Sequence, residues 1–167
     1  RAYVLGGVDV FPTEDLVLGV ALGLERVDSD TAFNGGGSEQ TGFTIAPYAA
    51  MSVGPSLSFD ASLGFSQLHV DQFRLDPLGA GRIDSDTKTR RLFFSGNVSY
   101  AQPVGERLLV TGRAGLLYAN SDTDAYIEDS GRNVANTDFT LGQLRVGGEA
   151  AYAWGDFEPF ASLTLEK

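Results

Sequence analysis

The residues best suited to hold a metal ion occur as three similar acidic tetrads. Residues 28–31 and 84–87 both read DSDT, and residues 121–124 read SDTD. A calcium site needs about six to eight converging oxygen ligands, and no tetrad belongs to an Asp-x-Asp-x-Asp-Gly loop with a distal Glu. We therefore expect the tetrads to mark positions in the fold and not to bind a metal.

The other residues lack the patterns of catalysis and cofactor binding. His69 is the single histidine, the chain has no cysteine, and no serine lies in Gly-x-Ser-x-Gly. One imidazole does not build a conventional zinc site. Residues 33–40, FNGGGSEQ, lack the preceding buried strand and the Lys-Ser/Thr pair of a phosphate-binding loop. We predict that the chain is not an enzyme and has no catalytic residue, no metal and no cofactor.

Length and charge narrow the class of protein. The 167 residues suffice for a single domain, residues 1–167. Twelve Lys and Arg against 22 Asp and Glu give a formal charge of -10, which argues against nucleic acid as a partner because phosphates must be neutralised. No stretch approaches the length of an apolar spanning helix. The opening RAYVLGG has none of the regions of a signal peptide.

Apolar side chains alternate with small or polar ones along most of the chain. In residues 16–24, LVLGVALGL, every second residue is large and apolar, and residues 43–53 and 57–65 show the same period. Five further segments alternate in this way: 3–11, 91–100, 108–118, 143–154 and 157–165. A period of two residues is that of a β-strand, so we predict an all-β protein of about eight strands.

The connections between these segments alternate strictly between short and long. The short ones are PTED (12–15), GPS (54–56), VGER (104–107) and WGD (154–156). The long ones lie around TAFNGGGSEQ (31–40), LDPLGAGRIDSDTK (75–88) and DAYIEDSGRNVANTD (124–138). Tight turns at one end and long loops at the other indicate an antiparallel up-and-down meander. Such asymmetry is typical of a bacterial outer-membrane barrel.

The two faces of the predicted sheet differ in polarity. In a membrane barrel the apolar face meets lipid and the inside is wet. The residues predicted to face the lumen are Asp9, Asp60, Arg91, Asn97, Arg113, Gln143, Arg145 and Glu149. The aromatics predicted to lie at the lipid interfaces are Phe11, Phe43, Phe94, Tyr100, Tyr118, Tyr152, Trp154 and Phe157. Ordinary sheet core is the alternative for these aromatics, because the period alone does not show which face meets lipid.

Four stretches resemble the autotransporter barrel, the translocator domain of type V secretion in Gram-negative bacteria. The stretches are LGGVDVFPTEDLVLGVALGLERVDSDTAFNGGG, TIAPYAAMSVGPSLSFDASLGFSQLHVDQFR, GNVSYAQPVGERLLVTGRAGLLYANSDTDAYIE and LRVGGEAAYAWGDFEPFASLTLE. The resemblance runs from residue 5 to residue 166, which is nearly the whole chain. The resemblance implies an outer-membrane protein. A complete translocator of this family has twelve strands, a helix through the lumen and an aromatic C-terminal residue, whereas this chain ends in SLTLEK.

Eight strands leave the closure of the barrel open. The chain is a portion of a larger barrel of about twelve strands, or its strands close alone, or further strands or other copies complete it. An open sheet edge is not tolerated in lipid, so a membrane-embedded form requires closure. Both chain ends are expected on the side of the long loops, because the first strand runs into a short turn.

The resemblance implies a mechanical function. We expect a barrel that contacts outer-membrane lipid, anchors a secreted passenger domain of the same polypeptide and supports its path across the membrane. The alternative is a closed eight-stranded barrel that binds a small ligand or serves as an adhesin-like surface module. On either reading the tetrads are expected to end the strand ladders at the outer water boundary, because Asp and Ser favour local hydrogen bonds and charge is costly in hydrocarbon.

Overall fold

The computed structural model describes residues 1–31, 35–76, 79 and 81–167. Its main element is an antiparallel sheet of eight strands in the order β1-β2-β3-β4-β5-β6-β9-β10. The strands are β1 (Ala2–Thr13), β2 (Leu16–Thr31), β3 (Gly36–Val53), β4 (Leu57–Leu75), β5 (Arg82–Val104), β6 (Leu108–Thr123), β9 (Thr137–Tyr152) and β10 (Phe160–Glu166). The predicted meander and its eight strands are confirmed.

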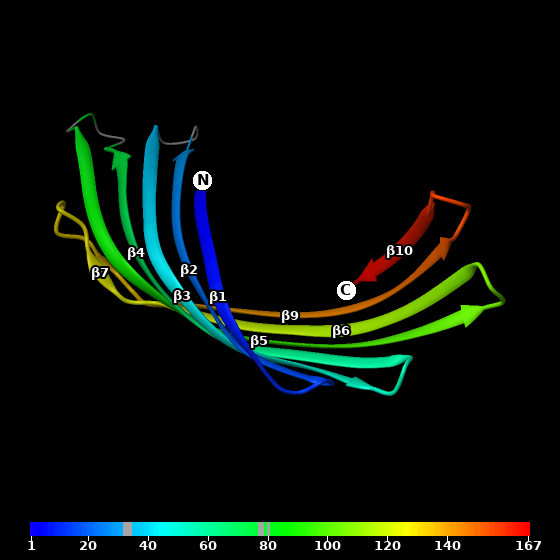
Figure 1. Ribbon diagram of the computed structural model, residues 1–167. Coiled ribbons are helices and arrows are strands. Elements are labelled where there is room, and N and C mark those ends of the chain that lie inside the picture. The colour runs from blue at the N-terminus through cyan, green and yellow to red at the C-terminus, as the bar shows by residue number, and fades with distance from the viewer. Residues whose placement is uncertain (32–34, 77–78, 80) are drawn as a thin grey trace.

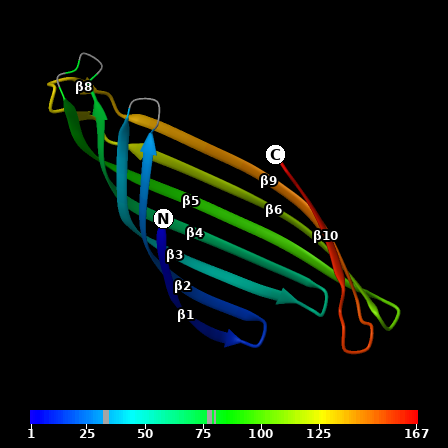
Figure 2. The same ribbon diagram turned by 90° about the horizontal axis from the view of Figure 1, so that it is seen from above.

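The sheet is bent into an open trough (Figures 1 and 2). β1 pairs only with β2 and β10 only with β9, so the two edges of the trough carry unpaired backbone groups. β1 and β10 stand apart across its mouth (Figure 1). The eight strands therefore do not form the closed barrel that the sequence left as an alternative. Within the described residues, none of the secondary structure is a helix suited to span a bilayer.

Short turns join the strands at one end of the sheet. Gly54, Gly105 and Gly155 adopt φ angles of 65°, 69° and 62° in three of these turns, a region that residues with a Cβ rarely enter. In β1 the register shifts between Val10 and Thr13, next to a proline that has no amide hydrogen for the ladder. These residues end the strands sharply, in agreement with the tight turns predicted from the sequence.

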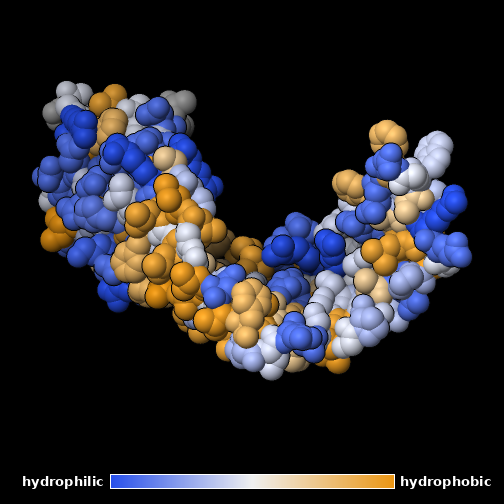
Figure 3. Space-filling view, viewed as in Figure 1, coloured by the Kyte–Doolittle hydropathy of each residue, from blue (hydrophilic) through white to orange (hydrophobic). Residues whose placement is uncertain are grey.

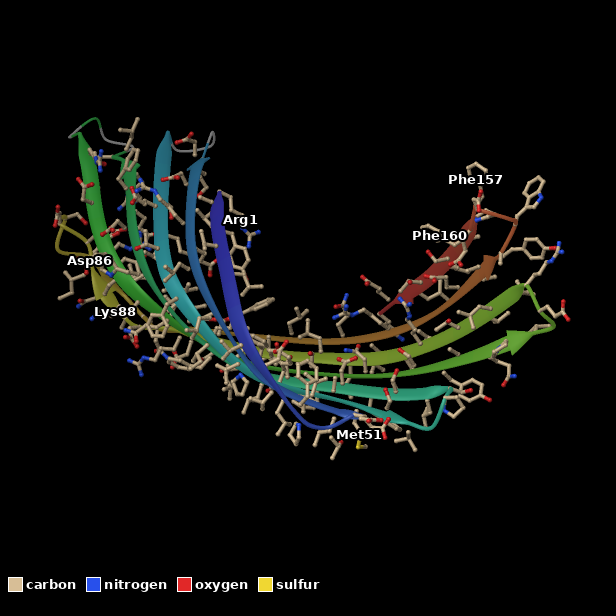
Figure 4. The ribbon with its side chains drawn as sticks, in the orientation of Figure 1. Arg1, Met51, Asp86, Lys88, Phe157 and Phe160 are labelled. Carbon is tan, nitrogen blue, oxygen red and sulfur yellow. The ribbon has the colours of Figure 1, made fainter. Side chains whose placement is uncertain are left out.

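Cross-strand pairing aligns the alternating side chains into an apolar convex face and a polar concave face. Leu22 lies opposite Ile45, Ile45 opposite Phe65, and Phe65 opposite Leu92. Met51, which belongs to the same face, lies on the outside of the trough (Figure 4). Figure 3 shows a hydrophobic band on the outer surface, with hydrophilic residues above it and in the hollow.

The distribution of buried residues is unlike that of a water-soluble domain. Among the described hydrophobic residues, only Leu68 and Ala151 are classed as buried. By contrast, Leu24 and Leu144 remain 64% and 63% exposed. Contiguous apolar surface of this extent marks contact with lipid or with another protein.

The apolar band has the height of a bilayer core. In β3 the convex face is apolar from Phe43 to Val53, which is about 34 Å of strand at about 3.4 Å per residue. A strand tilted by about 45° then spans about 24 Å, close to the apolar band of outer-membrane barrels. The hydrocarbon-facing part is therefore only about two thirds of this strand.

Beyond the band the strands continue farther than the sequence suggested. β3, β4 and β5 contain 18, 19 and 23 residues. The tetrads mark strand ends, as expected: residues 28–31 are the last four of β2, and residues 121–124 span the end of β6 at Thr123. Residues 84–87 lie just inside the start of β5 at Arg82, so this tetrad belongs to the ladder. Polar cross-strand contacts sustain the ladder there, such as Arg26 Nη2 to Glu39 Oε2 at 2.9 Å. The tetrads do lie toward the end of the sheet opposite the short turns, as predicted.

A second, two-stranded sheet occupies the connection between β6 and β9. It consists of β7 (Tyr126–Ile127) and β8 (Asn133–Val134). The sequence predicted only a long loop at this place. The hairpin does not extend freely from the sheet, because Asp129 N donates to the backbone oxygen of Asp84 in β5 at 3.0 Å.

Gly64 provides a test of packing on the concave face. A Cβ at this position would overlap the ring of Phe93, which lies on the neighbouring strand directly opposite. We expect Gly64→Val to lower the free energy of unfolding by about 1–3 kcal/mol, because the ring must move. The midpoint of urea-induced unfolding of the full-length protein measures this change.

Gly112→Val is the matched control, because a Cβ at Gly112 meets no atom within 4 Å. This variant should unfold at or above the urea concentration of the parent, since valine favours strands. Equal destabilisation by both substitutions would contradict the packing of Phe93 over Gly64.

Candidate functional site: the polar concave face

The structure places all eight residues predicted to face the lumen on one face, the concave one. They come from β1, β4, β5, β6 and β9, and the register of each strand pair keeps them on the same side. Several interact across strands. Asp60 lies opposite Asn97, and Asn97 Nδ2 donates to Asp60 Oδ2 at 2.6 Å.

Asp9 is held by a residue that the sequence did not single out. The Tyr48 hydroxyl of β3 donates to Asp9 Oδ1 of β1, across the intervening strand β2. Gly19 of β2 lies beneath this contact, and a Cβ there would meet the Tyr48 ring and the Asp9 carboxylate. A glycine in the middle strand thus lets side chains from the first and third strands meet.

Arginines line the half of the concave face formed by β5, β6 and β9. Arg91 Nε donates to Ser121 Oγ at 3.2 Å, and Arg113 Nη2 lies 3.9 Å from Glu149 Oε2. Gln143 Nε2 donates to Glu166 Oε2 of β10 at 3.0 Å. The Arg145 Nε atom is buried and has no hydrogen-bond partner within the described part of the chain.

Charge is unevenly distributed across the trough. The β1–β4 half carries the carboxylates of Asp9, Glu25 and Asp60, whereas the β5–β9 half carries the three arginines already named together with Glu149. Arg1 lies 3.8 Å from Glu25 on the acidic half, and Arg74 of β4 lies toward the outer end of this half. Charges of opposite sign on facing walls create a field across the space between them. The concave face is therefore a polar wall suited to water and to a charged or polar polypeptide.

The segment that carries β7 and β8 is fastened to the outer part of this face. Arg74 Nε and Nη2 donate to Glu128 Oε1 and Oε2 at 3.0 and 2.7 Å, and Gln72 Nε2 donates to the Tyr126 hydroxyl at 2.7 Å. Glu128 is only 7% exposed. The hydrogen bond from Arg74 holds the pKa of the Glu128 carboxyl below its usual value, against the effect of burial, and a bond from Ser130 acts in the same direction.

The predicted interface aromatics occupy several kinds of position. Phe43, Phe94, Tyr100, Tyr118 and Tyr152 share the convex face by the register of their strands. Trp154 and Phe157 pair with each other in the turn before β10. Phe11 lies at the register shift of β1. The assignment of these side chains to the lipid interfaces stays a prediction.

The described residues contain no group of three or more His, Cys, Asp or Glu side chains that could hold a metal ion. His69 lies on the convex face, with Nε2 3.4 Å from Asp71 Oδ1. The Gly-rich stretch falls partly outside the described residues, at positions 33 and 34, and its remainder begins β3.

Sequence reasoning missed Tyr48 and the Arg74–Glu128 pair. Tyr48 carried a signal, because it is an aromatic residue with a hydroxyl group on the face opposite to that of Ile45 and Pro47. The ion pair carried none, since residues 54 positions apart meet only because β4 pairs with β5 and the β7–β8 hairpin bonds to β5.

The family profile described as the autotransporter beta-domain matches residues 2–167. The chain belongs to this family. Its place is therefore the outer membrane of a Gram-negative bacterium, which accounts for the apolar convex face. No curated protein matches the chain in sequence.

Two solved autotransporter structures are similar in fold. The translocator domain of NalP from Neisseria meningitidis is 15% identical with a TM-score of 0.76, and the beta domain of Bordetella BrkA is 17% identical with a TM-score of 0.77. Each comparison covers 98% of this chain. The chain spans 58% of the NalP structure and 70% of the BrkA structure.

The Arg74–Glu128 pair of this autotransporter beta-domain predicts an acid-sensitive outer hairpin. Because the pKa of Glu128 is lowered in the folded state, the pair stabilises the hairpin above the ordinary carboxyl pKa of about 4, and this contribution is lost as the pH falls through the lowered value. Amide hydrogen exchange of residues 124–136 in the full-length protein should accelerate as the pH falls below about 4, beyond the intrinsic pH effect.

Glu128→Gln should raise exchange in this segment at neutral pH and remove its additional acid dependence. Arg26→Gln is a suitable control, because Arg26 pairs with Glu39 between β2 and β3, away from the hairpin. Unchanged protection in the Glu128 variant at neutral pH would show that the pair does not hold the hairpin.

Proposed function

We propose that this chain forms part of the wall of a translocator barrel, which anchors a passenger domain of the same polypeptide and carries it across the outer membrane. The observation that supports this most strongly is the combination of the family match with two faces of opposite polarity. The convex face suits lipid, and the concave face suits a hydrated lumen. In this proposal the eight predicted residues face that lumen.

Further strands complete the barrel in this account. The unpaired edges of β1 and β10 cannot remain in hydrocarbon, where no water satisfies their amide and carbonyl groups. The NalP and BrkA structures both extend beyond the region that matches this chain. We therefore assign the missing partners of β1 and β10 to additional strands of the full-length polypeptide, in preference to other copies, and treat the complete barrel as one domain.

The role of the barrel is mechanical and not catalytic in this proposal. Its concave side chains are engaged in cross-strand pairs such as Asn97 with Asp60, which stiffen the wall. Any enzyme activity of the full-length protein is assigned to the passenger. The charge on the wall keeps the lumen hydrated and lowers the cost of passage for a polar polypeptide segment.

Reversing the arginine wall tests this function. In the full-length protein, Arg113→Glu combined with Arg145→Glu places two more carboxylates beside Glu149, so both halves of the trough become acidic. We expect the amount of passenger at the cell surface to fall severalfold, because carboxylates of a passing segment then meet like charge on both halves of the lumen. Protease release of passenger from intact cells measures the effect.

Heat-modifiable migration on gels shows in the same samples whether the barrel has assembled. Arg107→Glu is the control, because Arg107 lies in a short turn. Normal surface passenger with an assembled double-reversal barrel would count against transport along the concave face. The milder pair Arg113→Gln and Arg145→Gln provides a second test if the reversal prevents assembly.

A further inference from the structure

Two cations, a histidine and a glutamine lie together on the convex face just outside the apolar band. His69 of β4 lies opposite Lys88 of β5, and Gln67 lies opposite Arg90. We call these four residues the cationic patch. All four share the face that carries Phe65 and its neighbours, by the period of the two strands.

The patch directly adjoins hydrocarbon-facing side chains. One step inward along the same face, Phe65 lies opposite Leu92. The rings of Phe65 and Phe43 meet edge to face, with centroids 6.5 Å apart and an interplanar angle of 60°. On β4 and β5 the donors of the patch are therefore the first polar groups that follow the apolar band toward the outside.

On β2 to β5, carboxylates occupy the next row of residues outward. Asp71 lies opposite Asp86, and Glu39 and Asp28 continue this row across β3 and β2. Ion pairs between the two rows would form equally well if the carboxylates lay beside the hydrocarbon and the cations lay farther out. On β4 and β5 the order observed, with cations beside the hydrocarbon and carboxylates farther out, matches a phosphate located at the edge of a lipid layer. On the side of β6, Asp122 lies opposite Arg90, so the patch is open to a phosphate from the side of β3 and β4.

The side chains of the patch are exposed and can be reached by a ligand. The Arg90 side chain is 58% exposed although it pairs with Asp124 at 3.0 Å, and that of His69 is 46% exposed. Lys88 is exposed, and no carboxylate of the described residues lies within 4.0 Å of its ammonium group. Exposed ion pairs contribute little, and a guanidinium has five N–H donors. Lys88 and Arg90 therefore retain donors for a phosphate.

An apolar groove of about 600 Å³ lies inward of the patch on the membrane-embedded part of the sheet. Small residues from four adjacent strands line it: Ala49, Ala61, Gly96 and Ala114. Gly96 is six residues from Arg90 along β5, which is about 20 Å of strand. Its lining is almost wholly apolar, which suits an acyl chain.

We propose that the cationic patch binds the phosphate of an outer-leaflet lipid whose acyl chains cover the apolar band and enter the groove. Lys88 and Arg90 supply the charge and multiple N–H donors, and His69 and Gln67 supply further hydrogen bonds. The row of carboxylates repels a phosphate that lies farther out, which fixes the depth of the headgroup. This inference rests on membrane embedding alone, so its failure would leave the transport proposal intact.

Native mass spectrometry of the full-length protein in detergent tests the proposal with two matched probes. These are lipid A, a phosphorylated and acylated disaccharide, and the same lipid after removal of its phosphates. We expect severalfold higher occupancy by lipid A. The combined substitutions His69→Gln, Lys88→Gln and Arg90→Gln should abolish this preference, whereas Lys88→Arg with Arg90→Lys should keep it.

Arg107→Gln is the control for loss of one positive charge elsewhere, and it should retain the preference for lipid A. Inorganic phosphate at the same concentration should not displace the lipid, since it lacks the acyl chains. Equal occupancy by both lipids, full displacement by inorganic phosphate, or an unchanged preference in a folded triple-Gln variant would each overturn the proposal. Heat-modifiable migration establishes folding in every sample.

Discussion

Hydrocarbon offers no hydrogen-bonding partner to a peptide group, and the rest of this structure depends on that constraint. A strand in the bilayer must pair along both edges, so neighbouring strands join in one continuous meander. The inner six strands of the sheet satisfy this requirement on both sides. Only β1 and β10 do not, and these two edges define where the remaining wall of the barrel must attach. The trough is thus a section of a closed structure.

The same solvent boundary explains the contrast between the two faces. On the convex face, leucine, valine and aromatic side chains remain exposed because lipid replaces a protein core. On the concave face, polar side chains bind one another across strands, and glycines make room for larger partners. Gly19 lies beneath the contact of Tyr48 with Asp9, and Gly64 lies beneath Phe93. The register of the strands therefore determines both the packing that stabilises the sheet and which polar side chains meet on its concave face.

Periodicity was enough to predict the strands, the meander and the common face of residues such as Asp60, Asn97 and Arg113. It was not enough to predict where the strands end. The tetrad at 84–87 looks like loop in composition, yet it belongs to β5 because its backbone pairs with β4. Contacts such as Arg74 with Glu128 depend on the register of distant segments, which no local pattern contains. The composition of a segment indicates whether its residues meet water or lipid, whereas backbone pairing determines whether they belong to a strand.

The assignment of lipid to the convex face and water to the concave face is the central claim, and the absence of cysteine from the chain makes it directly measurable. Single cysteines are placed at each of positions 58–63 of β4 in the full-length protein in membranes. Their reaction rates with a charged, membrane-impermeant thiol reagent are then compared. The account predicts fast labelling at Ser58, Asp60 and Ser62, and protection at Phe59, Ala61 and Leu63. Fast labelling of the second set with protection of the first, or equal rates along the strand, would contradict it.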